Sequence, residues 1–171
     1  MTCVVGSVAR GKVSVGADSI IVHGDDVMYA ADPKVWQSGP ALVGAAGDWI
    51  YLDLLRRIDF PAALDENWLR YGFTAAFRKL KSDLGLSAET ENEPDGEAVI
   101  GALGALWWLD SDSIIKSALS YAATGIGQTV AMGALAVLPG SMPSSRRCLR
   151  ALEAAEKHCS GVRGPFTVLT I

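Results

Sequence analysis

The sequence lacks an excess of basic residues, a long apolar run and an export signal, and each absence excludes a class of protein. Its 15 Lys and Arg residues against 19 Asp and Glu residues give a net charge of -4, which offers no attraction to nucleic acid or anionic membranes. The longest apolar stretches, residues 101–109 and 129–138, are too short to cross a bilayer. No basic segment followed by an apolar core opens the sequence, so we do not expect export.

Cysteine and histidine are also too sparse to form a disulfide framework or a metal site. The three cysteines (Cys3, Cys148 and Cys159) are an odd number without metal-ligand spacing, and only two histidines occur. This usage suits a reducing compartment, so we expect a cytoplasmic protein without a metal or other cofactor. No Gly-x-x-x-x-Gly-Lys-[Ser/Thr] motif is present, so any ATP-driven partner must be a separate chain.

The residues that are present favour one globular domain, which we place at residues 1–171. Half of them are hydrophobic and 20% are charged, as expected of a chain with a buried core. The predicted order is strands, two helices, strands, two helices and a strand. It favours an α+β fold in which helix pairs cover a mostly antiparallel double sheet. Strands are predicted at residues 2–8, 13–18, 20–23, 27–29, 41–48, 98–109, 114–123 and 166–171, and helices at residues 49–58, 66–84, from 128 onward, and 144–159.

Local signals predict the ends and the apolar faces of the first two helices. Asp65 is available as the N-cap of the second helix, and Gly85 is its stop signal. Residues 87–96 are acidic, and we interpret them as a solvated connector rather than a binding segment. Helical spacing predicts that Ile50, Leu54 and Ile58 share one face of the first helix, and that Leu69, Phe73, Ala76, Leu80 and Leu84 share one face of the second.

The first two strands are predicted to form a hairpin that brings the start of the chain beside a carboxylate. Arg10 and Gly11 fit a two-residue turn, because glycine readily adopts positive φ. Counting outward from this turn places Thr2 opposite Ser19, so that Asp18 lies about one residue away. Further along, Trp107 and Trp108 should point to opposite faces of a strand, one into the core and the other toward a partner.

These positions allow a specific chemistry. If Met1 is removed, Thr2 carries both a hydroxyl nucleophile and an α-amine whose pKa lies near neutrality. A lysine ammonium lowers the pKa of a neighbouring hydroxyl, and a carboxylate holds the lysine; Lys34 and Asp18 are the candidates. A backbone N–H of Gly44 or Gly47 could stabilise an acyl oxyanion.

The combined spacing resembles a known family. Thr2, Gly16-Ala17-Asp18, Val27-Met28 and Lys34-Val35 resemble the amino-terminal third of the proteasome β-subunit and HslV-type peptidases. "ALVGAAGD" is similar to that family's glycine-containing strand, and "GIGQTVAMGAL" to its Gly-Ser-Gly-Gln stretch before a helix. The similarity covers nearly the whole chain. It implies the four-layer α-β-β-α sandwich of the N-terminal nucleophile hydrolases, in agreement with the predicted element order.

The resemblance also implies a function and a set of site residues. Thr2 would be nucleophile and, through its amine, general base; Lys34 would tune its hydroxyl, Asp18 would hold Lys34, and Gly44 would stabilise the oxyanion. Peptide bonds would be hydrolysed through an acyl ester on Thr2 inside a homo-oligomer of stacked rings, which a separate ATP-dependent unfoldase would supply with polypeptide. An apolar specificity pocket is implied at Ile21, Leu42 and Ala46.

The sequence departs from the family at three positions that normally support the terminal amine. A serine, an aspartate and a serine of the family align with Ile126, Cys159 and Val162. An amine among these residues would be less oriented and more desolvated, which lowers its pKa. We favour an active enzyme over a weak or inactive, structural ring-forming module. A small-molecule amidase and a nucleophilic Cys3 remain as alternatives.

Overall fold

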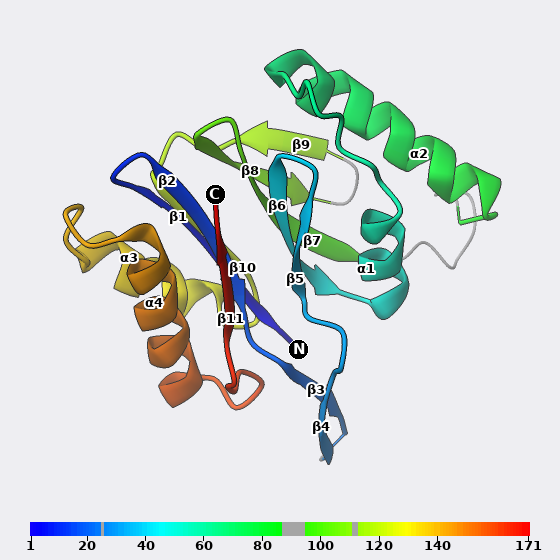
Figure 1. The fold of residues 1–171 in the computed structure, drawn as a ribbon. Helices are drawn as coiled ribbons and strands as arrows, with labels where there is room; N and C mark the ends of the chain where they lie inside the picture. Colours follow the sequence, from blue (N-terminus) through cyan, green and yellow to red (C-terminus); the bar gives the residue numbers. More distant parts are fainter. Residues whose placement is uncertain (25, 87–94, 111–112) are drawn as a thin grey trace.

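The structure, a computed structural model, describes residues 1–24, 26–86, 95–110 and 113–171, and Figure 1 shows two sheets between two pairs of helices. Most of the acidic segment at residues 87–96 therefore lies outside the described residues. The first sheet has the strand order β10-β1-β2-β11, with all pairs antiparallel. Its strands are β1 (Cys3–Ala9), β2 (Lys12–Ala17), β10 (Tyr121–Gly125) and β11 (Thr167–Thr170).

The second sheet has the order β5-β6-β7-β8-β9 and is also antiparallel throughout. A separate ribbon of β3 (Ile20–His23) and β4 (Asp26–Tyr29) extends away from the sandwich beside the N-terminus (Figure 1). The strands of the second sheet are β5 (Val35–Ser38), β6 (Ala41–Gly47), β7 (Gly96–Ala102), β8 (Ala105–Asp110) and β9 (Ser113–Lys116).

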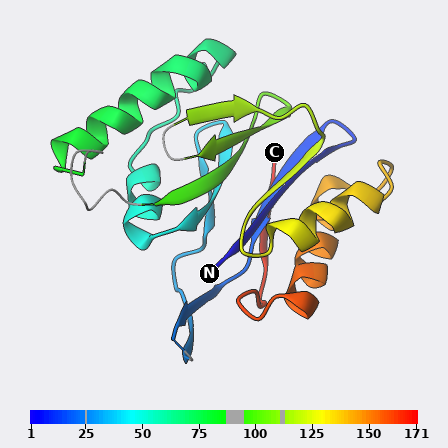
Figure 2. The ribbon, with the colours of Figure 1, turned by 180° about the vertical axis from the view of Figure 1, so that it is seen from behind.

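Helices cover the outer face of each sheet, so the predicted four-layer α-β-β-α architecture is confirmed. Helix α1 (Trp49–Arg56), a π-helical segment (Trp68–Gly72) and α2 (Phe73–Asp83) pack on the second sheet, and α3 (Gln128–Val137) and α4 (Ser144–His158) pack on the first. Seen from behind in Figure 2, the two helix pairs lie on opposite sides of the sheets. A third apolar cluster fills the space between the sheets. No helix within the described ranges is long and apolar enough to span a membrane.

The first hairpin has the predicted register. Ala9 pairs with Lys12 and Val4 with Ala17, so continuing the ladder places Thr2 opposite Ser19. Arg10 and Gly11 both have positive φ, 54° and 70°, as a two-residue turn between twisted strands requires. A short local turn therefore determines where the chain start lies relative to Asp18.

The helix signals were only partly correct. The Asp65 carboxylate accepts a hydrogen bond from the Trp68 N–H at 2.7 Å, and Gly85 has a φ of 71°, so both predicted ends are confirmed. The prediction for Ile50 was wrong: its side chain is exposed, and α1 packs through its tyrosine and three leucines. Leu84 is also exposed, because it follows the last residue of α2.

The sequence predicted two segments as continuous strands, but each of them is divided in the structure. Residues 98–109 form β7 and β8, joined by a turn in which Leu103 and Gly104 have φ of 54° and 70°. Residues 114–123 cross from β9 in the second sheet to β10 in the first. Trp107 is fully buried under the helices, while Trp108, on the opposite face, borders a cavity between the sheets. A partner at Trp108 stays a prediction.

Candidate active site

Thr2 lies immediately before β1, at the open end of the space between the sheets. Alternation along β1 places its side chain on the same face as Val4, which belongs to the apolar cluster between the sheets. Thr2 is 6% exposed, and its Oγ1 donates a hydrogen bond to the Met1 carbonyl at 2.7 Å. Met1 itself is half exposed. The hydroxyl is therefore buried beside the peptide bond that joins Met1 to Thr2.

Asp18 and Lys34 form a buried ion pair next to this peptide bond. The Lys34 Nζ donates to Asp18 Oδ2 at 3.1 Å, and the two side chains are 2% and 0% exposed. Asp18 also accepts hydrogen bonds from the backbone N–H groups of Cys3 at 2.8 Å and Ile20 at 3.3 Å. Lys34 donates further to the carbonyls of Ile20 at 2.5 Å and Met1 at 3.3 Å. The carboxylate thus holds the ammonium at the Met1–Thr2 bond.

Burial gives this pair its electrostatic character. Desolvation raises the pKa of the Asp18 carboxyl, against the opposing effects of the Lys34 ammonium and two backbone N–H groups. Desolvation likewise lowers the pKa of Lys34, against the attraction of Asp18. Each charge therefore offsets part of the desolvation that burial imposes on the other, and the pair stays together beside the Met1–Thr2 bond.

The structure does not place Gly44 at the nucleophile. Gly44 lies within β6, paired with Val35 on one side and Val99 on the other, and a Cβ there would meet Val4 and Val15 at 2.6 and 2.8 Å. Gly44 therefore belongs to the packing between the sheets and is not among the residues that line the Thr2 cavity, so an oxyanion role for its N–H stays a prediction.

Gly47, the other glycine predicted as an oxyanion donor, lies next to Thr2. It lines the small cavity, of about 20 Å³, that contains Thr2 and Lys34. The Ala45 N–H donates to the Lys34 carbonyl at 3.0 Å. Because alternate residues of a strand direct their N–H groups to the same side, we expect the Gly47 N–H to point to that side too. Gly47 has a φ of 130°, a conformation that favours glycine.

The three residues predicted to form the specificity pocket are separated. Ile21 lines the Thr2 cavity, together with Trp49 and Leu52 of α1. Ala46 borders a neighbouring cavity that shares Gly47 with the first. Leu42 is fully buried between the sheets, so its assignment to the pocket was wrong. Helix α1 supplies the apolar walls that the sequence analysis missed.

The three supporting positions lie around the start of β1. Cys3 pairs with Gly125, so one further step of the ladder places Ile126 opposite Thr2; its side chain is 52% exposed. Val162 is buried in the same cluster as Cys3, and Cys159 packs against that cluster. Burial, reinforced by the Asp18 carboxylate, raises the pKa of the Cys3 thiol to about 12, which argues against Cys3 as a nucleophile.

The neighbouring cavity is lined by Glu97, for which the sequence predicted no role, and by Asp95, which belongs to the segment interpreted as a solvated connector. It has a volume of about 260 Å³ and is lined by Ala46, Gly47, Asp95, Gly96, Glu97, Gly125 and Gln128. Glu97 is hydrogen-bonded to Thr124 across the gap between the sheets. Strand alternation could have placed Glu97 on the face of Val99, but the sequence does not signal that β7 stacks on β10.

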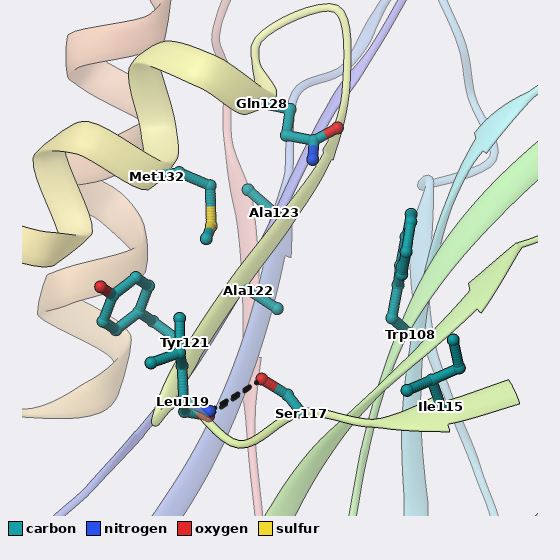
Figure 3. Close-up of a pocket in the computed structure, with 9 residues that line it drawn as sticks. All are labelled: Trp108, Ile115, Ser117, Leu119, Tyr121, Ala122, Ala123, Gln128 and Met132. Atoms are coloured by element: carbon teal, nitrogen blue, oxygen red, sulfur yellow. Dashed lines mark hydrogen bonds between the residues drawn. The ribbon is translucent and has the colours of Figure 1, made fainter.

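A third cavity, of about 170 Å³, is apolar and shares Gln128 with the second. Figure 3 shows Trp108 and Ile115 on one side of it and Ala123 and Met132 on the other. The three cavities therefore follow one another from Thr2, through Gly47 and Gln128, to Trp108. Within the described part of the chain, no group of His, Cys, Asp and Glu side chains is arranged to hold a metal ion.

The architecture matches solved structures over the whole chain at low sequence identity. Thiobacillus denitrificans BPH in complex with epoxomicin has a TM-score of 0.82 and 16% identity, covering 99% of this chain and 97% of that one. HslV from Trypanosoma brucei has a TM-score of 0.74 and 15% identity, covering 98% of each chain. A Gly-1 mutant of Anbu from Hyphomicrobium sp. strain MC1 has a TM-score of 0.75 and 13% identity, covering 100% of this chain and 82% of that one.

No family model and no curated protein matches the sequence. The two antiparallel sheets, their covering helices and the full-length structural matches nevertheless agree with one another. The chain therefore has the fold of the proteasome β-like N-terminal nucleophile hydrolases.

Proposed function

We propose that the chain is a threonine peptidase in which Thr2 becomes the nucleophile once Met1 has been removed. One observation carries the proposal: the buried Asp18–Lys34 pair, whose Nζ atom lies 3.3 Å from the Met1 carbonyl oxygen, beside the Thr2 hydroxyl. A buried ion pair is costly to maintain, and a neighbouring positive charge lowers the pKa of a hydroxyl and so makes it a better nucleophile. The fold is consistent with this chemistry but does not establish it.

The proposed reaction uses groups of this chain in each step. The Thr2 α-amine takes the proton of Oγ1 as that oxygen attacks the substrate carbonyl carbon, and the Lys34 ammonium stabilises the developing alkoxide. The Gly47 N–H donates to the oxyanion. The tetrahedral intermediate then collapses. The peptide C–N bond breaks, and the leaving nitrogen takes the proton held by the Thr2 amine. Water then attacks the ester carbonyl carbon and loses a proton to the amine. The bond between that carbon and Thr2 Oγ1 breaks, Oγ1 takes the proton from the amine, and the carboxylic acid product leaves.

Met1 blocks this reaction while it is attached. The Thr2 nitrogen is then an amide nitrogen, which is not basic. The Met1 carbonyl also accepts the Lys34 hydrogen bond, and Met1 forms part of the wall of the Thr2 cavity, where substrate would bind. Removal of Met1 would convert the Thr2 nitrogen into a basic amine. It would also free one N–H donor of Lys34 and enlarge the cavity.

We further propose that the substrate is a polypeptide with an apolar residue before the cleaved bond. Ile21, Trp49 and Leu52 surround the Thr2 cavity with apolar side chains. The succession of cavities toward Trp108 suits an extended chain better than a compact small molecule.

The proposed setting is a homo-oligomeric ring in the cytoplasm, served by a separate ATP-dependent unfoldase. The β3–β4 ribbon supports assembly, because Val27, Met28 and Tyr29 all expose apolar surface on a strand that extends from the body (Figure 1).

A second candidate is a ring-forming module with little or no activity. It is favoured by the side chains of Ile126, Cys159 and Val162, which offer the terminal amine little hydrogen bonding. The two candidates share a fold and an assembly, so only the reactivity of Thr2 separates them.

The test is intact mass together with hydrolysis of a fluorogenic peptide that carries an apolar residue before the reporter. We expect loss of Met1, a mass increase with a threonine-directed covalent inhibitor, and cleavage that Thr2→Ala abolishes. Thr74→Ala, on α2, is the control and should cleave normally. Equal cleavage by the parent and Thr2→Ala would refute the threonine assignment. Epoxomicin, present in the Thiobacillus denitrificans structure, is a natural first inhibitor.

A further inference from the structure

A hydrogen bond between the two sheets lies at the end of the sandwich that contains Thr2. Thr124 of β10 is fully buried, and its hydroxyl donates to the carboxylate of Glu97 on β7. Thr124 pairs with Val4 on β1, and Glu97 pairs with Ala46 on β6. A carboxylate from the second sheet is thus held against the strand that neighbours β1 in the first.

The direction of the β1 backbone brings the Thr2 nitrogen to the same side. The Cys3 N–H donates to the Asp18 carboxylate, and the Cys3 carbonyl accepts from the Asp18 N–H at 3.3 Å, so both groups of Cys3 face β2. Because backbone groups alternate along a strand, the nitrogen and carbonyl of Thr2 face β10. A Cβ on Gly125 of β10 would lie only 2.3 Å from the Thr2 carbonyl oxygen, which confirms how closely that strand approaches.

The side chains involved also share one face and one cavity. Val4 and Thr124 are directly opposite each other, so Thr2, two residues before Val4, is a diagonal neighbour of Thr124 on the face between the sheets. Glu97 and Gly125 both line the cavity of about 260 Å³ that borders the Thr2 cavity at Gly47. The Glu97 side chain therefore borders open space beside Gly47 and Gly125, at the end of the sandwich that contains Thr2.

We propose that Glu97 is a positioning residue whose carboxylate accepts a hydrogen bond from the Thr2 α-amine after Met1 has been removed. Thr124 holds Glu97 on the β10 side, where the amine emerges. Glu97 thereby takes the place of the polar support absent at Ile126, Cys159 and Val162. The inference rests on the proposed removal of Met1, and it predicts a property of the amine that can be measured whether or not peptides are cleaved.

The charges around the amine determine the sign of the effect. A nearby carboxylate favours the ammonium form and so raises the pKa of the amine, whereas the Lys34 ammonium opposes it. Asp18 already neutralises Lys34 in the ion pair. Neutralising Glu97 therefore removes the negative charge that favours the ammonium form of the amine. The ionisable residues near the end of β1 are Cys3 on β1 itself, Asp18 after β2, Lys34 before β5, Asp48 before α1, Asp95 and Glu97 at the start of β7, and Cys159 and Arg163 after α4.

The experiment measures the α-amine directly. The chain is expressed behind a cleavable ubiquitin-like fusion whose removal leaves Thr2 as the first residue. The rate of Thr2 acetylation by acetic anhydride is then followed against pH by mass spectrometry. We expect Glu97→Gln to lower the amine pKa by about one unit, Glu97→Asp to lower it less, and Glu153→Gln, at a partly buried carboxylate that pairs with Arg150 on α4, to leave it unchanged.

An unchanged or raised amine pKa in Glu97→Gln would overturn the inference. The pH dependence of peptide hydrolysis is a second readout. Since the neutral amine is the base, its acidic limb should move to lower pH in Glu97→Gln, while kcat falls on the order of tenfold and KM is unchanged. Thr2-dependent hydrolysis with an unaltered profile in Glu97→Gln refutes only the role of Glu97. Absence of hydrolysis in the parent chain refutes the peptidase proposal and leaves the amine measurement to decide the inference.

Discussion

Replacing Lys34 with methionine should destabilise the fold and abolish the proposed reaction. Methionine keeps the length and apolar stem of lysine but removes its charge, so Asp18 would remain as a buried carboxylate without its cation. In the structure the two charges are 3.1 Å apart and almost fully excluded from solvent. At an effective dielectric constant of about 20 their attraction is about 5 kcal/mol. Desolvation offsets part of this gain when the pair forms.

The measurable loss is the cost of leaving one buried charge unpaired, about 3–5 kcal/mol in the free energy of unfolding. Two backbone N–H groups still bind the Asp18 carboxylate, which favours the lower end of this range. Because Lys34 also donates to the Ile20 carbonyl, Asp18→Asn in the same chain should restore only part of the stability. The double variant should nevertheless be more stable than Lys34→Met alone.

The assay is urea unfolding of the parent, both single variants and the double variant, followed by tryptophan fluorescence. Lys79→Met is a matched control, since Lys79 forms an ion pair with Asp83 at 2.7 Å in which both side chains are largely exposed. It should change stability by less than about 1 kcal/mol. If Lys34→Met and Lys79→Met lower the free energy of unfolding by the same amount, the buried ion pair does not stabilise the fold as its geometry implies.

Three further predictions concern thiols, packing and a helix cap. At pH 8 iodoacetamide should modify Cys159 well before Cys3 and Cys148, because burial raises the pKa of both other thiols to about 12; equal rates by mass spectrometry would contradict this. Gly44→Ala should lower stability by about 1–3 kcal/mol in urea, since its Cβ would lie 2.6 and 2.8 Å from two valine side chains. Asp65→Ala should lower stability by about 1 kcal/mol through loss of a cap, with Asp65→Asn largely retaining it.

Local features of the fold could be predicted because a few neighbouring residues determine them. The Arg10-Gly11 turn gives the β1–β2 register, and that register alone brings Thr2 near Asp18. The Asp65 cap and the Gly85 stop depend on the same kind of short-range geometry. The turn at Leu103 was missed because leucine carries no preference for positive φ.

Placements that depend on how the sheets stack could not be predicted. Leu42 and Gly44 lie on the face of β6 that packs against the first sheet, so neither lines the Thr2 cavity, although both belong to the predicted motif. Gly47 reaches it because β6 extends past β5 at the open end of the sandwich.

The sequence by itself determined the α+β element order, the first hairpin and the association of Thr2 with Asp18 and Lys34. Only the tertiary structure decided that Gly47, rather than Gly44, lies beside Thr2 and that Glu97 meets Thr124 across the sheets. The physical reason is the range of the interactions. A hairpin is specified by adjacent residues, whereas contacts between β7 and β10 depend on the alignment of two separately formed sheets, which every layer of the core helps to set.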